Sequence, residues 1–134
     1  YIIRSYIMYK PSNLPPPAKV PTVLFKEKTT YSYWLRLYRR MSKPERFGIG
    51  EKIDILFLQI LELTHTSRFT SISNKLPYLE QAVLKIDRIK FFAEIAWENK
   101  LINNKEYSEF FHKLEEIGRE LGGWKKGLSK NSHS

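Results

Sequence analysis

Four successive stretches of this chain place apolar residues three and four positions apart, the spacing that gives an α-helix one apolar side. The stretches cover about residues 29–42, 49–64, 73–99 and 104–121. No strand-like alternation of apolar and polar residues competes with this pattern, and the connections between the stretches are short. The sequence therefore predicts an all-α fold, an antiparallel up-down four-helix bundle.

The side of each helix that should face the bundle core is marked by its largest apolar residues. In chain order these inner stripes are Tyr31, Trp34, Leu35, Tyr38 and Met41; Ile53, Leu56, Phe57, Ile60 and Thr64; Leu76, Leu79, Val83, Ile86, Ala93 and Trp97; and Tyr107, Phe110, Leu114, Ile117 and Leu121. Gly122 and Gly123 follow the last stripe. Because glycine disfavours helix, we expect the fourth helix to end near Leu121 and Trp124 to pack back onto it.

Three regions are expected along the chain. Residues 11–21 hold five of the seven prolines, which fix φ and lack an N–H donor, so residues 1–26 are predicted to form an extended, basic, polyproline-like arm. Residues 27–124 would form the bundle, and residues 125–134 a basic and polar tail. The absence of cysteine favours a reducing compartment, and no apolar run or signal segment indicates a membrane. We expect a cytoplasmic protein.

Basic residues are concentrated in the first third of the chain. Residues 1–47 carry ten basic and two acidic groups, a net charge of +8, whereas residues 48–134 carry 13 basic and 12 acidic groups, a net charge of +1. This bias favours a polyanion such as nucleic acid, although a merely soluble basic protein is the alternative. The predicted contacts are Arg36, Arg39, Arg40 and Lys43 on the outer side of the first helix, Arg46 in the connector, and Lys125 and Lys126 near the end. The last two lysines would also suit the negative end of a helix dipole.

Two helices have a second apolar stripe that one bundle core does not accommodate. These outer stripes consist of Ile55 and Leu58 on the second helix, and Leu84, Phe91 and Ile95 on the third. A helix that is apolar on two sides must bury both, so we expect bundles to pack side by side in a homo-oligomer through these residues. The alternative is that the arm of residues 1–26 folds over one of the stripes.

Two Glu-x-x-His pairs raise the question of a dinuclear metal site, because such pairs hold iron or manganese inside some bundles. They are Glu62 with His65 and Glu109 with His112. Both pairs lie on the sides of their helices that point away from the inner stripes, whereas metal ligands would have to project inward. We therefore expect no metal, no cofactor and no enzymatic activity. Lys90, in register with the third inner stripe, is expected to snorkel or to pair with a carboxylate such as Asp54 or Glu62.

Three segments carry a resemblance to a known family: "SKPERFGIGEKI", "LINNKEYSEF" and "IGRELGGWKK". In the first of them, the two glycines are free to take positive φ. Together these segments resemble the accessory variability determinants, four-helix-bundle partners of the reverse transcriptase in diversity-generating retroelements. More broadly, the chain is similar to the bundle family encoded in intervening sequences of bacterial large-subunit ribosomal RNA genes. The resemblance covers about residues 24–126, and the proline-rich start is not part of it.

The resemblance implies a specific assembly and function. Members of this family form five-fold, ring-like homopentamers with a basic surface, bind nucleic acid and contact the reverse transcriptase. They support the mutagenic copying of a template RNA into cDNA, known as mutagenic retrohoming, without being enzymes. Two other functions stay open from the residues themselves. One is a structural homo-oligomer that binds only protein partners, and the other is a metal-dependent enzyme.

Overall fold

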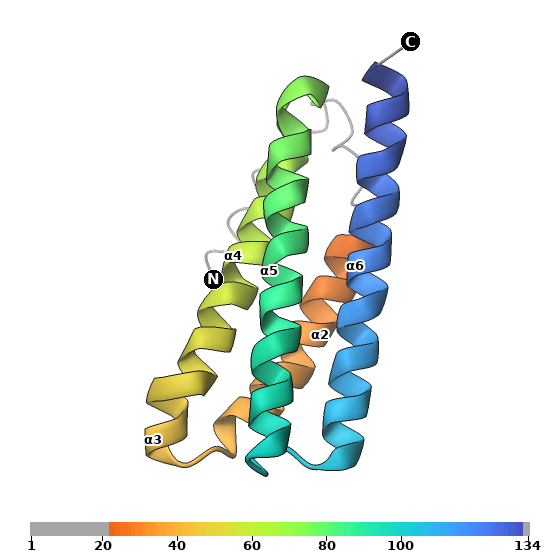
Figure 1. Ribbon diagram of the computed structural model, residues 1–134. Helices are drawn as coiled ribbons and strands as arrows, with labels where there is room; N and C mark the ends of the chain where they lie inside the picture. The colour runs from red at the N-terminus through yellow and green to blue at the C-terminus, as the bar shows by residue number, and fades with distance from the viewer. Residues whose placement is uncertain (1–21, 133–134) are drawn as a thin grey trace, which may run out of the picture.

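The computed structural model describes residues 22–132, of which Asn131 and Ser132 are described only in their backbone. This part of the chain is all-helical and contains no strand. Four long helices are arranged as a bundle, and two short helical turns connect the first two of them (Figure 1). The elements are α2 (Thr22–Arg39), α3 (Lys43–Glu45), the wide turn η1 (Arg46–Gly50), α4 (Glu51–Ser67), α5 (Ile72–Glu98) and α6 (Asn104–Ser132).

The predicted inner stripes supply most of the core. All predicted members on α4 are buried, as are the four on α6 from Phe110 onward. Trp97 departs from the prediction, because it remains 36% exposed while its ring stacks on Tyr107. Leu37, which the stripes did not include, is buried.

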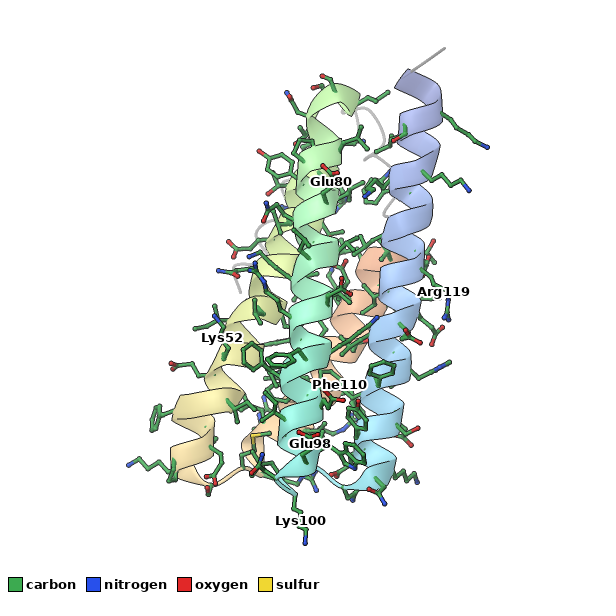
Figure 2. The ribbon with its side chains drawn as sticks, viewed as in Figure 1. Lys52, Glu80, Glu98, Lys100, Phe110 and Arg119 are labelled. Carbon is green, nitrogen blue, oxygen red and sulfur yellow. The ribbon has the colours of Figure 1, made fainter. Side chains whose placement is uncertain are left out.

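Trp34 lies at the centre of this core. Its ring stacks on those of Tyr38 and Phe110, with centroids 5.3 and 5.6 Å apart. Figure 2 shows Phe110 pointing into the space between the helices. The Trp34 indole N–H donates a hydrogen bond to the Asp54 carboxylate (3.3 Å), which also accepts one from the Tyr31 hydroxyl (2.8 Å). A single carboxylate therefore fixes two aromatic side chains of α2 against α4.

The first helix begins earlier than its apolar spacing predicted. It starts at Thr22 rather than near residue 29, and Val23 and Leu24 are buried in its first turn. The prediction of an extended arm is therefore wrong for residues 22–26. Burial of these two apolar side chains explains the difference, because tertiary packing stabilises a helix beyond its local propensity. Residues 1–21 of the predicted arm lie outside the described residues.

The last helix continues through the glycines that were expected to end it. It extends from Asn104 to Ser132, so the prediction of a separate tail from residue 125 is wrong. Leu128 is buried one heptad after Leu121 and continues the inner stripe, which offsets the low helix propensity of glycine. A Cβ atom added at Gly122 or Gly123 would meet nothing within 4 Å. These two glycines are therefore not required by the approach of another part of the bundle.

Gly50 in the connector has a different reason to be glycine. A Cβ atom there would lie 2.7 Å from Tyr38 Cε1 and 3.0 Å from the carbonyl oxygen of Glu45. Glycine would permit positive φ in this segment, but no glycine within residues 22–132 adopts it. The connector instead kinks at Gly48, where ψ is −110°. Close packing of Tyr38 against η1 is what excludes a side chain at Gly50.

Hydrogen bonds define both sides of the turn between α5 and α6. Lys100 adopts a left-handed conformation (φ 62°), and the backbone N–H groups of Lys100 and Leu101 donate to the carbonyls of Trp97 and Ala96. This is a Schellman motif, which usually has glycine at the left-handed position.

The α6 side of the same turn is a capping box. The Asn103 side chain accepts a hydrogen bond from the Glu106 backbone N–H (2.8 Å), and the Glu106 side chain accepts one from the Asn103 N–H (2.9 Å). The predicted start of the fourth helix, after Asn103 or Asn104, is confirmed.

Candidate nucleic-acid interface

The predicted cations of the first helix surround its C-terminal end and the connector that follows. We call Arg36, Arg39, Arg40, Lys43 and Arg46 the arginine cluster. All five side chains are exposed. Arg40 is paired with Glu106 at the start of α6, whereas the other four form no ion pair with any residue of the described range 22–132. Four of the five predicted cations are therefore not engaged by a carboxylate of the described residues.

Arg36 and Arg40 face α6. They line a hollow of about 390 Å³ between α2 and α6 together with Tyr33, Leu37, Asn103, Lys105, Glu106 and Glu109. The Arg36 guanidinium lies 5.3 Å from the centre of the Tyr33 ring. Burial raises the pKa of the Tyr33 phenol to about 12, and its hydrogen bond to Glu109 contributes to that increase. The two carboxylates offset part of the positive charge here, so this side of the cluster is mixed in charge.

Arg39 and Arg46 are closer to the α2–α4 side. Burial, followed by the hydrogen bond to Asp54, raises the pKa of Tyr31, and the positive charge of Arg39 partly opposes that increase. The Tyr38 hydroxyl donates a hydrogen bond to the backbone carbonyl of Arg46 (3.0 Å), which holds η1 against α2. The cluster therefore extends around the end of α2 and does not form the single flat face that the helical spacing predicted.

Lys125 and Lys126 are distant from the arginine cluster. Twenty residues of α6 separate Glu106, the partner of Arg40, from Lys126. At ~1.5 Å per residue this distance is about 30 Å. Lys125 lies 3.9 Å from Glu80 on α5, while Lys126 is exposed. The seven predicted contact residues therefore occupy two separate places on the bundle.

The outer apolar stripes are exposed in the single chain. Leu84 and Phe91 on α5 are 51% and 56% exposed, and Ile55 and Leu58 on α4 are 45% and 41% exposed. Ile95 is only partly exposed. The predicted second apolar side of each helix is thus present, and no described part of the chain covers it.

The two Glu-x-x-His pairs lie where their helical phase predicted. Glu62, His65 and His112 are exposed and Glu109 is partly exposed. His112 lies 3.4 Å from Glu116 in the next turn of its own helix. Within residues 22–132, no three histidine, aspartate or glutamate side chains are grouped to hold a metal ion.

The sequence prediction named the wrong partners for the half-buried Lys90 and did not identify the buried Glu27. Lys90 pairs with carboxylates, as expected, but its partners are Glu115 on α6 (3.4 Å) and Asp87 (4.0 Å) instead of Asp54 or Glu62. Glu27 is fully buried in α2, and one of its oxygens accepts a hydrogen bond from the Thr64 hydroxyl (2.7 Å). Burial raises the pKa of Glu27 to about 8. Glu27 is one residue after the predicted arm, and no periodic pattern marked it as a core residue.

None of the helices in the described residues 22–132 is long and apolar enough to cross a membrane. No family model, no curated protein and no solved structure matches this chain.

Proposed function

We propose that this protein is a non-catalytic accessory subunit of a reverse transcriptase that binds template RNA and cDNA through the arginine cluster. The observation that carries the proposal is that Arg36, Arg39, Lys43 and Arg46 are exposed and form no ion pair within the described residues. Because no carboxylate partner has to be displaced, these cations are available to bind phosphate oxygens. We propose the polymerase as the partner because three segments of the chain resemble accessory variability determinants.

The proposed contacts read charge and shape more than base sequence. The arginines protrude from the end of a helix and a connector, so the phosphates of a strand meet them first. Arginine suits this role because its planar guanidinium can donate two parallel hydrogen bonds to one phosphate. We therefore expect similar affinity for unrelated sequences.

The assembly we propose is a ring-like homopentamer of antiparallel up-down bundles. Its interfaces would contain the outer apolar stripes, Ile55 and Leu58 on α4 with Leu84, Phe91 and Ile95 on α5. Support comes from the 41–56% exposure of the first four side chains, because a monomer rarely leaves two such stripes in water. A ring would also bring several arginine clusters to one nucleic-acid strand.

The same stripes support a second candidate function, a homo-oligomer that binds only protein partners. The two functions differ in their response to removal of charge. In the variant Arg36→Gln, Arg39→Gln, Arg46→Gln, we expect the affinity for RNA and for DNA to fall by similar factors. The helical content should be unchanged, because none of these side chains belongs to the core.

The matched control is the variant Lys28→Gln, Lys52→Gln, Arg119→Gln, which loses the same charge at three exposed sites elsewhere. Lys52 and Arg119 point away from the bundle in Figure 2. Fluorescence anisotropy with labelled oligonucleotides measures both variants. Equal affinity of the cluster variant and the control would contradict the proposed interface. Absence of nucleic-acid binding by the natural chain would favour the protein-only function.

A further inference from the structure

The end of the bundle opposite the arginine cluster is formed by the α4–α5 turn and the last turns of α6. Figure 1 shows the turn and the C-terminal end of α6 at the same end of the molecule. Two contacts connect them. The Lys75 ammonium lies 5.7 Å from the centre of the Trp124 ring, and Lys125 lies 3.9 Å from Glu80. We call this region, residues 65–78 together with 122–132, the turn end.

The turn end is rich in basic side chains, although Glu80, the partner of Lys125, lies just outside it. Its two segments contain five basic residues and no acidic residue: Arg68, Lys75, Lys125, Lys126 and Lys130. Lys126 and Lys130 are exposed, and neither forms an ion pair with a residue in the range 22–132. The arginine cluster, by contrast, has Glu45 and Glu106 within or beside it.

An aromatic ring also protrudes at this end of the bundle. Phe69 is 69% exposed at the tip of the α4–α5 turn. Its ring forms a T-shaped pair with the His65 ring (centroids 5.3 Å apart), and the Arg68 guanidinium lies 5.2 Å from its centre. These contacts orient the ring, yet most of it stays open to solvent. These two contacts use only part of the ring, and the exposed remainder beside cations suits an external ligand that is both anionic and aromatic.

We propose that the turn end binds single-stranded nucleic acid, with one base stacked on Phe69 and the backbone phosphates on Lys75, Lys126 and Lys130. This inference rests on the proposed nucleic-acid function and assigns it a second site. Every base has a π face, so a phenylalanine platform flanked by cations binds single strands without reading sequence. In a duplex the bases are already stacked on each other, so the platform selects unpaired nucleotides.

Charge favours this ligand over a protein partner. A protein partner of a five-cation surface would need a matching acidic surface, whereas a strand carries both the charge and the rings. The turn end is about 30 Å from the arginine cluster along α6, at ~1.5 Å per residue. A strand that contacts both ends would therefore follow the length of one bundle.

The test uses the full chain with the substitution Phe69→Leu, which keeps an apolar side chain but removes the ring. Phe25→Leu is the matched control, because Phe25 is 68% exposed on α2 and lies outside the turn end. The probes are a labelled single strand of about ten nucleotides, within the usual site size of single-strand-binding modules, and a duplex of the same length. We expect Phe69→Leu to weaken single-strand binding about 5- to 100-fold, and duplex binding less than twofold. The control should leave both unchanged.

A second variant, Lys75→Gln, Lys126→Gln, Lys130→Gln, should weaken binding of both probes and reduce its salt dependence. Unchanged single-strand affinity in Phe69→Leu would overturn the stacking site, while the proposed function would stand if the arginine-cluster variant still lost affinity. If the natural chain binds neither probe, both the proposed function and this site are wrong. Binding of phosphatidylserine–phosphatidylcholine vesicles that depends on Phe69, without an effect on the single strand, would identify a membrane surface and overturn the site.

Discussion

At the scale of single residues, buried polar groups organise this bundle more than the apolar pattern reveals. Asp54 holds Tyr31 and Trp34 against α4, and Glu27 reaches Thr64 on the same helix. The second oxygen of Glu27 has no hydrogen-bond partner within the described residues. Burying an ionised carboxylate with one oxygen unpaired is unfavourable, which is why this group retains its proton to a higher pH.

Glu27 predicts a pH dependence of stability. The pKa of its carboxyl is about 8 in the folded chain, mainly through burial, against an ordinary value of 4.5. The folded state therefore binds more protons than the unfolded state between these values, and the contribution of Glu27 to the free energy of unfolding falls as pH rises. The slope is at most ~1.4 kcal/mol per pH unit.

The variant Glu27→Gln keeps a group that can bond to Thr64 but cannot ionise. Thermal unfolding followed by circular dichroism should show a higher Tm than the natural chain at pH 8 and little difference at pH 5. A lower Tm for the variant at pH 8 would mean that the carboxylate is ionised and stabilising in the folded protein.

At the scale of helices, α6 shows that local signals and packing compete. The sequence places two adjacent glycines where a helix commonly ends, yet α6 continues for nine residues beyond Gly123. Continued burial along the inner stripe, at Leu128, favours the helix. Glycine nevertheless reduces the stability of this segment, since it loses the most backbone freedom on folding.

Replacing Gly122 and Gly123 by alanine should therefore stabilise the protein. A Cβ atom at either position meets nothing within 4 Å, so only helix propensity changes. The expected gain is about 1 kcal/mol for each substitution, measured by urea denaturation. Gly50→Ala is the matched contrast, because its Cβ would lie 2.7 Å from Tyr38 Cε1 and should destabilise the fold. Destabilisation by both α6 substitutions would indicate that the end of α6 packs against something that the single bundle does not contain.

The helical elements were largely predictable from the sequence, whereas contacts between distant residues were not. Periodic apolar spacing located α4 and α5 to within a few residues and identified most of the core. It placed the start of α2 too late because Val23 and Leu24 stand in a proline-rich region that carries little periodic signal. The Arg40–Glu106 pair joins residues 66 positions apart, and no local spacing reports such a contact. For the same reason, helical spacing placed most of the arginine cluster on one face of the first helix. In the structure, some of these cations lie toward α6 and others toward α4.

At the scale of the whole molecule, the bundle has two basic ends and apolar outer stripes between them. In the proposed function, the cations bind a polyanion and the stripes pack against another apolar face. The basic ends and the outer stripes consist of different residues, so substitutions in one should leave binding by the other intact.

The combined change Leu84→Glu, Phe91→Glu should dissociate the proposed oligomer without unfolding the chain. Both side chains are more than half exposed, so a carboxylate there stays in water in the monomer but would be buried in the assembly. Light scattering after size-exclusion chromatography measures the mass, and circular dichroism measures the helicity. An oligomer of unchanged mass would exclude these stripes as the interface. The control is Asp87→Glu, a substitution at an exposed position of the same helix that keeps its charge and should leave the mass and the helicity unchanged.

The salt dependence of nucleic-acid binding by the natural chain is the most direct measurement of the central claim. If the arginine cluster neutralises about four phosphates, it should contribute about −2.8 for single strands and about −3.6 for duplex to the slope of the logarithm of the affinity against the logarithm of salt concentration. The slope should be the same for unrelated sequences, and it should become shallower in the variant that lacks Arg36, Arg39 and Arg46. Binding that does not change with salt, or no binding at low salt, would contradict a nucleic-acid-binding accessory subunit.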